Sequence, residues 1–353
     1  MHRGVRAGAR SEATVRPPVA AALAALLVLL LVGATGCSGG PAGSGGPAGS
    51  DGASATPRPS GSGAPAETVV DLRSRVTAFT GKLSAHGGYR GPDLSQRRAV
   101  ADGVRLTLDG ELSSARERLA AVGWTVRTLR DRTGGRAFAE LADEDAGVAR
   151  RRGWGRVYVS LGGGRPAWTV QAPHPVADLH SERLAVGTLL SAPRGVLVLA
   201  GAHRDADGGG GADVAHREDT VFDAVCAMLA GQGLPALQVH GFADDSLPGE
   251  DVVVSTGRGD AARRPAERLA DALDLRGLTV CRADGEECGD LEGRRNVQGV
   301  RAAALRVPFL HVEFNRSVRG GRESAEDAVG ALGEVARSWA EGPDATGPSA
   351  PAS

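Results

Sequence analysis

The sequence predicts an α/β fold with a mostly parallel or mixed open sheet flanked by helices. Short β-branched runs alternate with amphipathic helical stretches from Gly155 onward. Strands alternating with helices of this length are typical of a sheet covered on both faces. In addition, six of the eight histidines fall between 174 and 311, and four of these lie in, end or closely follow an expected strand. Functional side chains collect at strand ends in such sheets, so we expect a site there.

The expected elements divide the folded part into two regions. A helix-rich N-terminal accessory subdomain covers 68–165, with helices over 69–82 and 112–122 and a strand signal at 124–129. The α/β domain covers 166–341. Its strands, with one at 156–160 just before it, are expected at 168–172, 195–200, 236–240, 251–256 and 309–314. Its helices are expected at 181–190, 220–230 and 260–273.

The first residues have the order of a secretory signal. Four arginines precede an unbroken run of Ala, Leu and Val over 19–32. The run leads into the tetrapeptide Ala-Thr-Gly-Cys at 34–37, which resembles the lipobox of bacterial lipoproteins, although Ala34 stands where Leu is usual. We therefore expect 1–36 to be a lipoprotein signal peptide and Cys37 to be acylated. The protein would then be anchored in the lipid bilayer on the extracytoplasmic face of the cell membrane. The alternative is an ordinary signal peptide with an incidental cysteine.

Low-complexity segments flank the folded part. Residues 37–67 consist almost entirely of Gly, Pro, Ser and Ala, which predicts a flexible tether. Residues 342–353 have the same composition and are expected to form a disordered tail. The 41 basic and 42 acidic residues nearly cancel, and no basic block is present, so nothing favours a nucleic-acid partner.

Three further cysteines lie in the expected α/β domain. Cys281 and Cys288 bracket a short polar loop, and a local disulfide between them is expected in an oxidising compartment. Cys226 lies among apolar residues at helical spacing, which predicts a buried free thiol.

A histidine and a carboxylate lie four residues apart after the expected strand 168–172. His174 and Asp178 form this pair, and His240 ends another strand further along the chain. A short-spaced His/carboxylate pair with a distant histidine is typical of a catalytic zinc site, which keeps a coordination position open for water. The alternative is that Asp178 merely caps the helix that follows.

Several short motifs occur in a particular order. They are His174-Pro-Val-Ala-Asp178-Leu-His-Ser181-Glu182, Asp213-Val-Ala-His216, Gln238-Val-His240-Gly241, Asn296-Val-Gln-Gly299, and His311-Val-Glu313 followed by Arg319. This set resembles the phage-type poly-γ-glutamate hydrolases and, more distantly, the zinc carboxypeptidases, N-formylglutamate amidohydrolases and cell-wall amidases. The resemblance covers residues 165–325 and implies a zinc-dependent amide hydrolase with a zinc-peptidase-like α/β sandwich.

The resemblance also implies roles for individual residues. It makes His174, Asp178 and His240 the ligands of a Zn²⁺ ion and Glu313 the general base. Substrate-binding roles fall to a further set, namely His216, Arg204, Asn296 and Arg319. The family usually has Glu where this chain has the shorter Asp178, so Glu182 remains a rival third ligand.

Glu313 is flanked by apolar residues, and partial desolvation would raise its proton affinity into a useful range. The guanidinium groups of Arg319 and Arg204 are suited to holding a substrate carboxylate.

The remaining histidines of this region are weaker candidates for the site. His203 either belongs to the site or opens the glycine loop 208–211. We interpret His180 and His311 as structural, although His311 shares a strand face with Glu313.

Two functions are therefore compared. The first is a membrane-tethered, extracytoplasmic zinc-dependent hydrolase of a γ-glutamyl, peptide or cell-wall amide bond. The alternative is a non-catalytic lipoprotein that keeps the hydrolase fold and binds a substrate or partner, because a fold does not fix a function. A purely structural envelope protein gives no reason for histidines and carboxylates to gather at strand ends.

Overall fold

A computed structural model of the chain describes residues 67–143 and 152–342. All of these residues belong to one compact unit. The expected signal peptide, the acylated Cys37, almost all of the tether and nearly all of the C-terminal tail lie outside the described residues. No helix in the described part combines the length and the apolar character that a membrane span requires.

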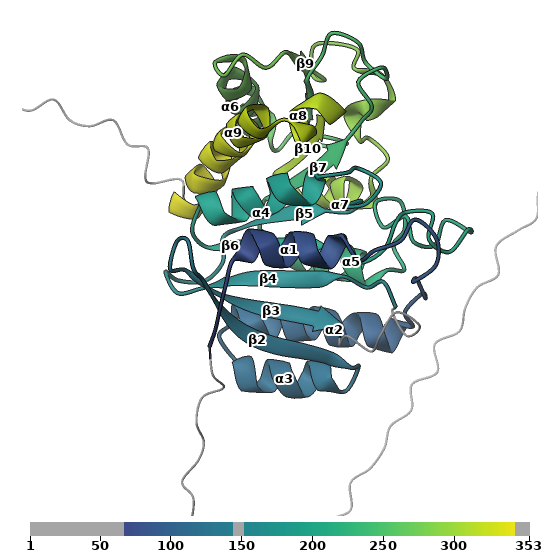
Figure 1. The fold of residues 1–353 in the computed structure, drawn as a ribbon, viewed down its shortest axis with the longest axis vertical. Helices are drawn as coiled ribbons and strands as arrows, with labels where there is room; N and C mark the ends of the chain where they lie inside the picture. The colour runs from purple at the N-terminus through teal and green to yellow at the C-terminus, as the bar shows by residue number, and fades with distance from the viewer. Residues whose placement is uncertain (1–66, 144–151, 343–353) are drawn as a thin grey trace, which may run out of the picture. The chain divides into compact units, whose positions relative to one another are not determined.

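Within these described ranges, ten strands form one mixed sheet in the order β1-β2-β3-β4-β6-β5-β7-β10-β8-β9 (Figure 1). The strands are β1 Thr68–Val70, β2 Trp124–Asp131, β3 Ala137–Asp143, β4 Arg156–Leu161, β5 Trp168–Ala172, β6 Gly195–Leu199, β7 Ala236–Gly241, β8 Val252–Ser255, β9 Val280–Arg282 and β10 Phe309–Phe314. Strands β6, β5, β7 and β10 run parallel to one another. Four pairs are antiparallel: β2 with β3, β3 with β4, β4 with β6, and β8 with β10. The expected mixed α/β sheet is confirmed.

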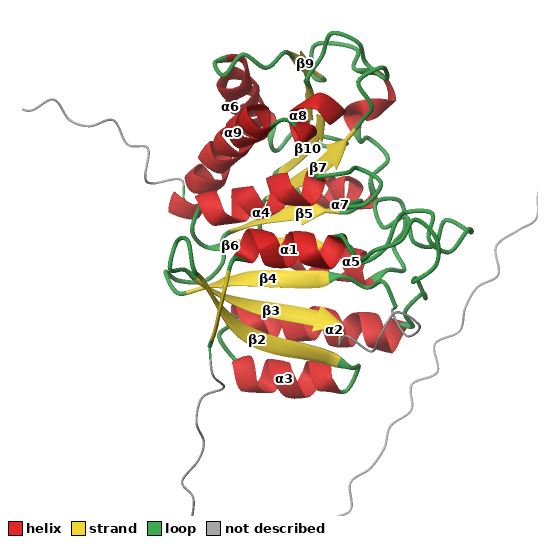
Figure 2. Cartoon of the chain, viewed as in Figure 1, coloured by secondary structure: helices red, strands yellow, loops and turns green. Residues whose placement is uncertain are grey.

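Helices cover both faces of this sheet (Figures 1 and 2). One face carries α1 Leu72–Thr80, α4 Ser181–Ser191, α6 Arg263–Asp274 and α9 Arg322–Glu341. The other face carries α2 Leu94–Leu108, α3 Leu112–Ala120, α5 Val221–Gly231 and α7 Val297–Leu305. The short helix α8 Arg316–Gly320 follows β10, and a 3-10 turn, η2, covers Gly289–Glu292. Each layer buries its own apolar cluster against the sheet, mainly of Leu, Val and Ala.

The local sequence explains where several of these helices begin. The expected helix over 69–82 is divided into β1 and α1, because the Asp71 carboxylate accepts a hydrogen bond from the backbone amide of Ser74 and caps α1. Helix α2 begins with a capping box made by Asp93 and Gln96. The sequence pattern had not indicated α2 or β3. In β3 the buried charge of Glu140 interrupts an otherwise apolar run.

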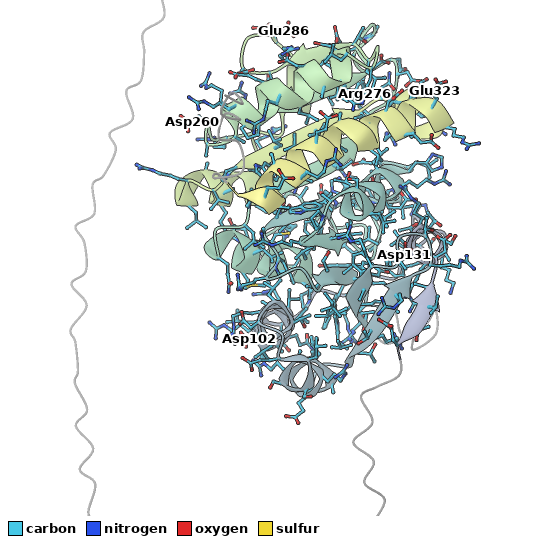
Figure 3. All side chains as sticks on the ribbon, turned by 90° about the vertical axis from the view of Figure 1, so that its left-hand side faces the viewer. Asp102, Asp131, Asp260, Arg276, Glu286 and Glu323 are labelled. Atoms are coloured by element: carbon cyan, nitrogen blue, oxygen red, sulfur yellow. A yellow bond between two sulfur atoms is a disulfide. The ribbon has the colours of Figure 1, made fainter. Side chains whose placement is uncertain are left out.

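The N-terminal region does not form a separate sheet. Strand β4 pairs with β6, with Val157 beside Val198, so β1 to β4 continue the sheet that carries the expected site. Charged side chains such as Asp260, Glu286 and Glu323 are exposed at the surface of the unit (Figure 3).

Candidate metal centre

The residues expected to bind metal come together at one edge of the sheet. His174 follows the end of β5, and His240 is the next-to-last residue of β7. Glu313 of β10 pairs in register with His240. Because β5, β7 and β10 run parallel, their carboxyl ends meet at this edge.

Three of these side chains are close enough to share one ion. The potential ligand atoms of His174, Asp178 and His240 all lie within 4.8 Å of one another. Oδ2 of Asp178 is 3.1 Å from Nδ1 of His240 and 3.5 Å from Nδ1 of His174. The three residues are only 1%, 6% and 4% exposed, in the order His174, Asp178, His240. The other such group in the described part contains Cys281 and Cys288, whose sulfur atoms are joined to each other.

The second nitrogen of each imidazole is held by an acceptor. Nε2 of His174 donates to Oδ1 of Asp213 over 2.8 Å. Nε2 of His240 donates to Oε1 of Gln238 over 3.0 Å. The amide nitrogen of Gln238 donates to the side-chain oxygens of Gln171 and Gln298, which fixes the orientation of the Gln238 amide. With a metal bound, these acceptors would hold the proton of each histidine on Nε2 and leave both Nδ1 atoms, which face Asp178, to the ion.

This arrangement fits a zinc ion. Nδ1 of His174 is buried and has no hydrogen-bond partner, although the Asp178 oxygen lies 3.5 Å away. An unpaired buried nitrogen is destabilising unless it binds something. Two imidazoles and a carboxylate form a common ligand set for catalytic zinc, and acceptors that hold the outer imidazole nitrogen are typical of such sites.

In the metal-free chain, the pKa values of these side chains are shifted because imidazoles and carboxylates lie close together. Burial opposes protonation of His174, but the carboxylates of Asp178 and Asp213 outweigh it and raise the pKa of His174 to about 9. Burial likewise opposes ionisation of those two carboxyls, yet their histidine neighbours hold both pKa values well below the usual range. Burial lowers the pKa of His240.

Glu313, the expected general base, lies beside this group. It is 9% exposed, and its Oε1 accepts a hydrogen bond from Nε2 of His311 over 3.2 Å. The amide nitrogen of Asn296 lies 3.2 Å from Nδ1 of His311 and donates to Oε1 of Gln238 over 2.6 Å. The ring centroids of His311 and His240 are 4.6 Å apart. His311 and Asn296 thus connect the carboxylate of Glu313 to the histidine group.

A pocket of about 280 Å³ opens next to Asn296. His216, Arg294 and Arg295 are among its lining residues. Nδ1 of His216 is 3.1 Å from Oδ2 of Asp213, and Arg204 donates to the same oxygen over 2.8 Å. His216 and Arg204 therefore contact Asp213, the partner of His174, and Asn296 lies beside His240 and His311. Their substrate-binding role stays a prediction.

Arg319 is held mainly by backbone carbonyls. It is 5% exposed, and its guanidinium donates to the backbone carbonyls of Phe314, Leu179 and Phe242. These bonds use all three of its nitrogens, so Arg319 ties together the loops that follow β7, β10 and the His174–Asp178 turn. Two of its five N–H groups take part in none of these bonds, and its substrate-binding role stays a prediction.

The structure also bears on two alternatives, namely Glu182 as the third metal ligand and Asp178 as the cap of α4. Glu182 lies in the first turn of α4, is not part of the three-residue group, and packs near Thr80 of α1. Burial raises the pKa of the Glu182 carboxyl. The side chain of Asp178 does not cap α4, because the residue at the cap is His180 and no side-chain cap bond forms there.

Two other histidines have local roles in the chain. Nδ1 of His203 accepts a hydrogen bond from the backbone amide of Asp205, at the start of the loop that carries Gly208. His180 has a left-handed backbone with φ of 76° at the turn into α4.

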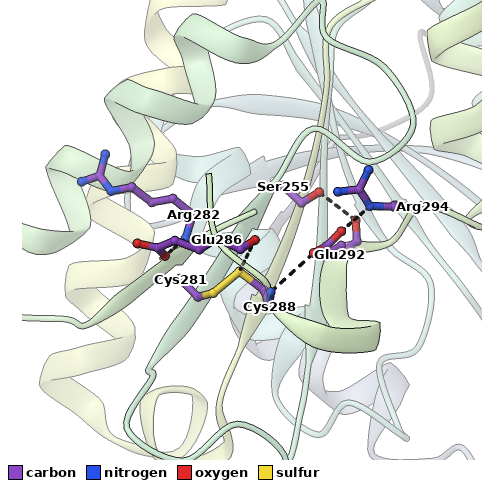
Figure 4. Close-up of a disulfide and its surroundings, with 7 residues drawn as sticks. All are labelled: Ser255, Cys281, Arg282, Glu286, Cys288, Glu292 and Arg294. Carbon is purple, nitrogen blue, oxygen red and sulfur yellow. Dashed lines mark hydrogen bonds and ion pairs between the residues drawn. A yellow bond between two sulfur atoms is a disulfide. The ribbon is translucent and has the colours of Figure 1, made fainter. Parts of the chain in front are cut away.

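A disulfide supports the wall of the pocket (Figure 4). Cys281 and Cys288 are joined, whereas Cys226 is a buried free thiol. The backbone amide of Cys288 donates to the Glu292 carboxylate, which also binds the Arg294 guanidinium. Ser255 of β8 donates to the backbone carbonyl of Glu292 over 2.7 Å. The disulfide loop thereby holds the segment that leads to Arg295 and Asn296.

Three residues of this site received no role from the sequence. Asp213 stands in a quoted motif, and Gln238 shares a strand face with His240, so the period of two could have indicated it. Arg295 precedes Asn296 in a loop whose position depends on the disulfide and on η2. No local pattern distinguishes it from other exposed arginines.

Comparisons with known proteins locate similar structures but no family. No protein-family model matches the chain, and no curated protein matches it. A bacteriophage poly-γ-glutamate hydrolase shares 13% identity over 48% of this chain and 83% of its own, with a TM-score of 0.35. A proposed carboxypeptidase from Burkholderia mallei shares 12% over 64% and 67%, with a TM-score of 0.35. A proposed metallopeptidase from Shewanella baltica shares 14% over 67% and 91%, with a TM-score of 0.31. Since these values are low, inferences about activity rest on the residues of the site.

Proposed function

We propose that this chain is a zinc-dependent amide hydrolase that acts outside the cytoplasm while tethered to the membrane by acylated Cys37. The bond it cuts belongs to a γ-glutamyl, peptide or cell-wall amide. The basic-then-apolar signal and the cysteine at its end support the location. The residues of the metal centre support the proposal of zinc-dependent amide hydrolysis.

One observation carries the proposal. Nδ1 of His174 is buried without a hydrogen-bond partner, in a group whose other two members are Asp178 and His240. Asp213 and Gln238 hold the outer nitrogens of the two imidazoles, so the inner nitrogens, which face Asp178, would be the atoms that bind a metal. Leaving a nitrogen buried and unpaired costs about 1–3 kcal/mol. At His174, unlike at Trp124, two further potential metal ligands lie beside the unpaired atom.

In this proposal, each residue of the site has a separate role. A zinc ion held by His174, Asp178 and His240 would supply a Lewis acid and lower the pKa of a water molecule. The Glu313 carboxylate accepts the proton of the attacking water and later returns it to the leaving amine. The Nε2–H group of His311 holds the carboxylate in place, and Asn296 in turn orients His311.

Recognition of a charged substrate falls to Arg295 in this proposal, since three of the five N–H groups of Arg319 already bind backbone carbonyls. Arg295 lines the pocket beside Asn296 and is exposed. Its guanidinium is suited to binding a carboxylate of the substrate through two parallel hydrogen bonds. His216, which lines the same pocket, is suited to contact the polar backbone of the substrate.

Elemental analysis tests the metal centre directly. Protein without residues 1–66 is compared with its His174→Ala/His240→Ala variant, and circular dichroism checks that both are folded. We expect close to one zinc per wild-type chain and almost none in the variant. A wild type that binds no zinc even when zinc is supplied would contradict the hydrolase proposal and favour a binding lipoprotein.

Fractionation tests the tether separately. Full-length protein is expected in the membrane fraction, and a Cys37→Ser variant in the soluble extracytoplasmic fraction. Equal distribution of the two proteins would contradict acylation at Cys37 and leave the metal centre unaffected.

A further inference from the structure

Three buried polar side chains extend from the metal centre into the helix layer that contains α5 and α7. They are Gln238 of β7, Gln298 in the first turn of α7 and Asp223 in the first turn of α5, and we call them the polar network. Their exposed fractions are 0%, 4% and 2%, in that order. Helices α5 and α7 pack against each other on one face of the sheet (Figure 1), so the polar network joins the sheet to both helices.

Hydrogen bonds connect each member of the polar network to the next. Nε2 of Gln238 donates to Oε1 of Gln298 over 3.1 Å and to Oε1 of Gln171 over 3.0 Å. Nε2 of Gln298 donates to Oδ1 of Asp223 over 3.1 Å and to the backbone carbonyl of Val214 over 2.9 Å. Each of the two amide nitrogens therefore has two acceptors, one for each of its hydrogens.

Asp223 provides an acceptor at the end of the polar network. Nη1 of Arg301, whose side chain is 27% exposed, donates to Oδ2 of Asp223 over 2.9 Å. Burial raises the pKa of the Asp223 carboxyl, but Arg301 and Gln298 oppose this shift and favour the ionised form. A carboxylate and a backbone carbonyl such as that of Val214 can only accept hydrogen bonds. The end of Gln298 that faces these two acceptors must therefore be its NH₂ group.

This constraint sets the direction of the remaining bonds. With its nitrogen toward Asp223, Gln298 presents Oε1 to Gln238, so the adjacent end of Gln238 is its NH₂ group. The Gln238 oxygen then faces Nε2 of His240 over 3.0 Å, and an oxygen in this position favours a proton on that nitrogen. Asn296 also donates to the Gln238 oxygen but does not fix its direction, because an amide between imidazoles can turn over.

We propose that Gln298, held by Asp223, is a positioning residue for the metal ligand His240. In this role Gln298 keeps the Gln238 oxygen on Nε2, so that Nδ1 of His240, which faces Asp178, is left to the ion. A reversed Gln238 amide would direct hydrogens at Nε2 and favour a proton on Nδ1, where it opposes metal binding. The inference rests on the proposed function, and it assigns a role in zinc binding to residues of α5 and α7.

Zinc affinity tests the proposal in three variants. Gln298→Met removes the amide at similar side-chain length, and Asp223→Asn removes the charge while the Val214 carbonyl stays in place. Glu140→Gln is the matched control, because it also neutralises a buried carboxylate bound by arginine, in the part of the sheet without the metal centre. A competition titration with a chelator of known affinity measures each Kd, and circular dichroism confirms that each variant is folded.

The three variants should differ in the size of the effect. We expect Gln298→Met to raise the Kd for zinc about tenfold, at the lower end of what residues that orient a ligand histidine contribute. Asp223→Asn should raise it about threefold, because Val214 still holds the amide, and Glu140→Gln less than about twofold. Equal Kd values for Gln298→Met and Glu140→Gln would overturn the proposal and leave the zinc site itself standing.

The tautomer of His240 gives a second measurement, which a general loss of stability would not change. In the metal-free chain Nδ1 lies 3.1 Å from Oδ2 of Asp178, so Asp178 and Gln238 compete for the ring proton. NMR of the ring nitrogens in histidine-labelled protein, at a pH at which the ring is neutral, should show less of the Nε2–H tautomer in Gln298→Met than in the wild type. An unchanged balance of tautomers would overturn the proposal.

This second measurement separates the two possible failures. It needs no zinc, so a wild type that binds no zinc would contradict the proposed function, and the balance of His240 tautomers would still decide the role of Gln298. If Gln298→Met does not fold, Asp223→Asn takes its place in the NMR measurement, with a smaller shift expected in the same direction.

Discussion

Two buried ionic groups lie in the same sheet and differ in one respect. In the antiparallel region, both oxygens of Glu140 accept hydrogen bonds from arginine or tyrosine. In the parallel region, Nδ1 of His174 has no partner. Nε of Arg156, beside Glu140, is also buried without a partner, so an unpaired atom alone does not distinguish the two groups. They differ in their donor sets: two imidazoles and a carboxylate lie within 4.8 Å of one another in the parallel region, whereas the Glu140 group has one carboxylate among cations.

Strand direction explains where each group formed. The parallel strands β5, β7 and β10 end at one edge, so His174, His240 and Glu313 gather there. Antiparallel neighbours such as β2, β3 and β4 end at alternate edges. Their charged residues instead meet across the strands, where Arg127, Glu140 and Tyr158 are in register.

The largest expected effect concerns function in the parallel region. Glu313→Gln should reduce amide hydrolysis by about 10³-fold, because general-base catalysis commonly contributes about 10²–10⁴-fold. The zinc content and thermal stability should remain those of the wild type. Turnover rates and elemental analysis on the same preparation check this. Full activity in the variant would exclude Glu313 as the base.

The next effect concerns the residue that holds His174. Asp213→Ala should raise the Kd for zinc by about 10–100-fold, because residues that orient a ligand histidine typically contribute this much. Asp219→Ala is the matched control, since Asp219 lies on the same segment and pairs only with Arg217 among the described side chains. A competition titration with a chelator of known affinity measures both. Similar Kd values in the two variants would contradict the role of Asp213.

Substitution of Glu140 in the antiparallel region should lower the stability of the fold without changing zinc binding. Glu140→Gln should lower the free energy of unfolding by about 2 kcal/mol, less than for a fully buried pair because Arg75 and Arg156 keep partial contact with solvent. Urea unfolding and zinc content together measure the effect. Loss of zinc in this variant would remove the distinction between the two groups.

The same carboxyl predicts an acid dependence. Burial opposes ionisation of Glu140, but Arg75 and Arg156 outweigh it and lower the pKa of Glu140 from 4.5. A lowered folded-state pKa gives stability that is present above the unfolded pKa and is lost as pH falls through the folded pKa. Urea unfolding should therefore show wild-type stability falling below pH 4.5, with a smaller decline in Glu140→Gln. Parallel declines would show that other groups dominate.

The smallest effect is expected from the disulfide. Cys281→Ser/Cys288→Ser should cost at most about 2 kcal/mol, because the closed loop is short, with a separation of 7 residues. Zinc binding should be unchanged, while KM should rise as the wall carrying Arg295 loosens. Unfolding curves and steady-state kinetics check the two parts. An unchanged KM would show that Glu292 and Ser255 suffice to hold that wall.

Local pattern accounted for much of the fold around the site. The expected strands over 168–172, 195–200, 236–240 and 309–314 agree with β5, β6, β7 and β10 to within one residue at each end. These strands are short apolar runs bounded by turns, so the period and the boundaries are both visible in the chain. The sequence pattern does not predict strand β3, because a charged residue, Glu140, stands at its centre. Glu140 can be buried there only because Arg75 and Arg156, from elements distant in the sequence, donate hydrogen bonds to it.

By itself, then, the sequence determined the alternation of strands and helices and the positions of His174, Asp178, His240 and Glu313 at strand ends, because side-chain periodicity and turn residues are local properties. Only the tertiary structure decided which side chains form hydrogen bonds with these residues. It brought Asp213 to His174 across 39 residues and Gln298 to Gln238 across 60. It also directed Arg319 to backbone carbonyls and continued the sheet from β6 into β4. These outcomes depend on strand order and on competition among buried polar groups for the same partners, and no local spacing encodes either.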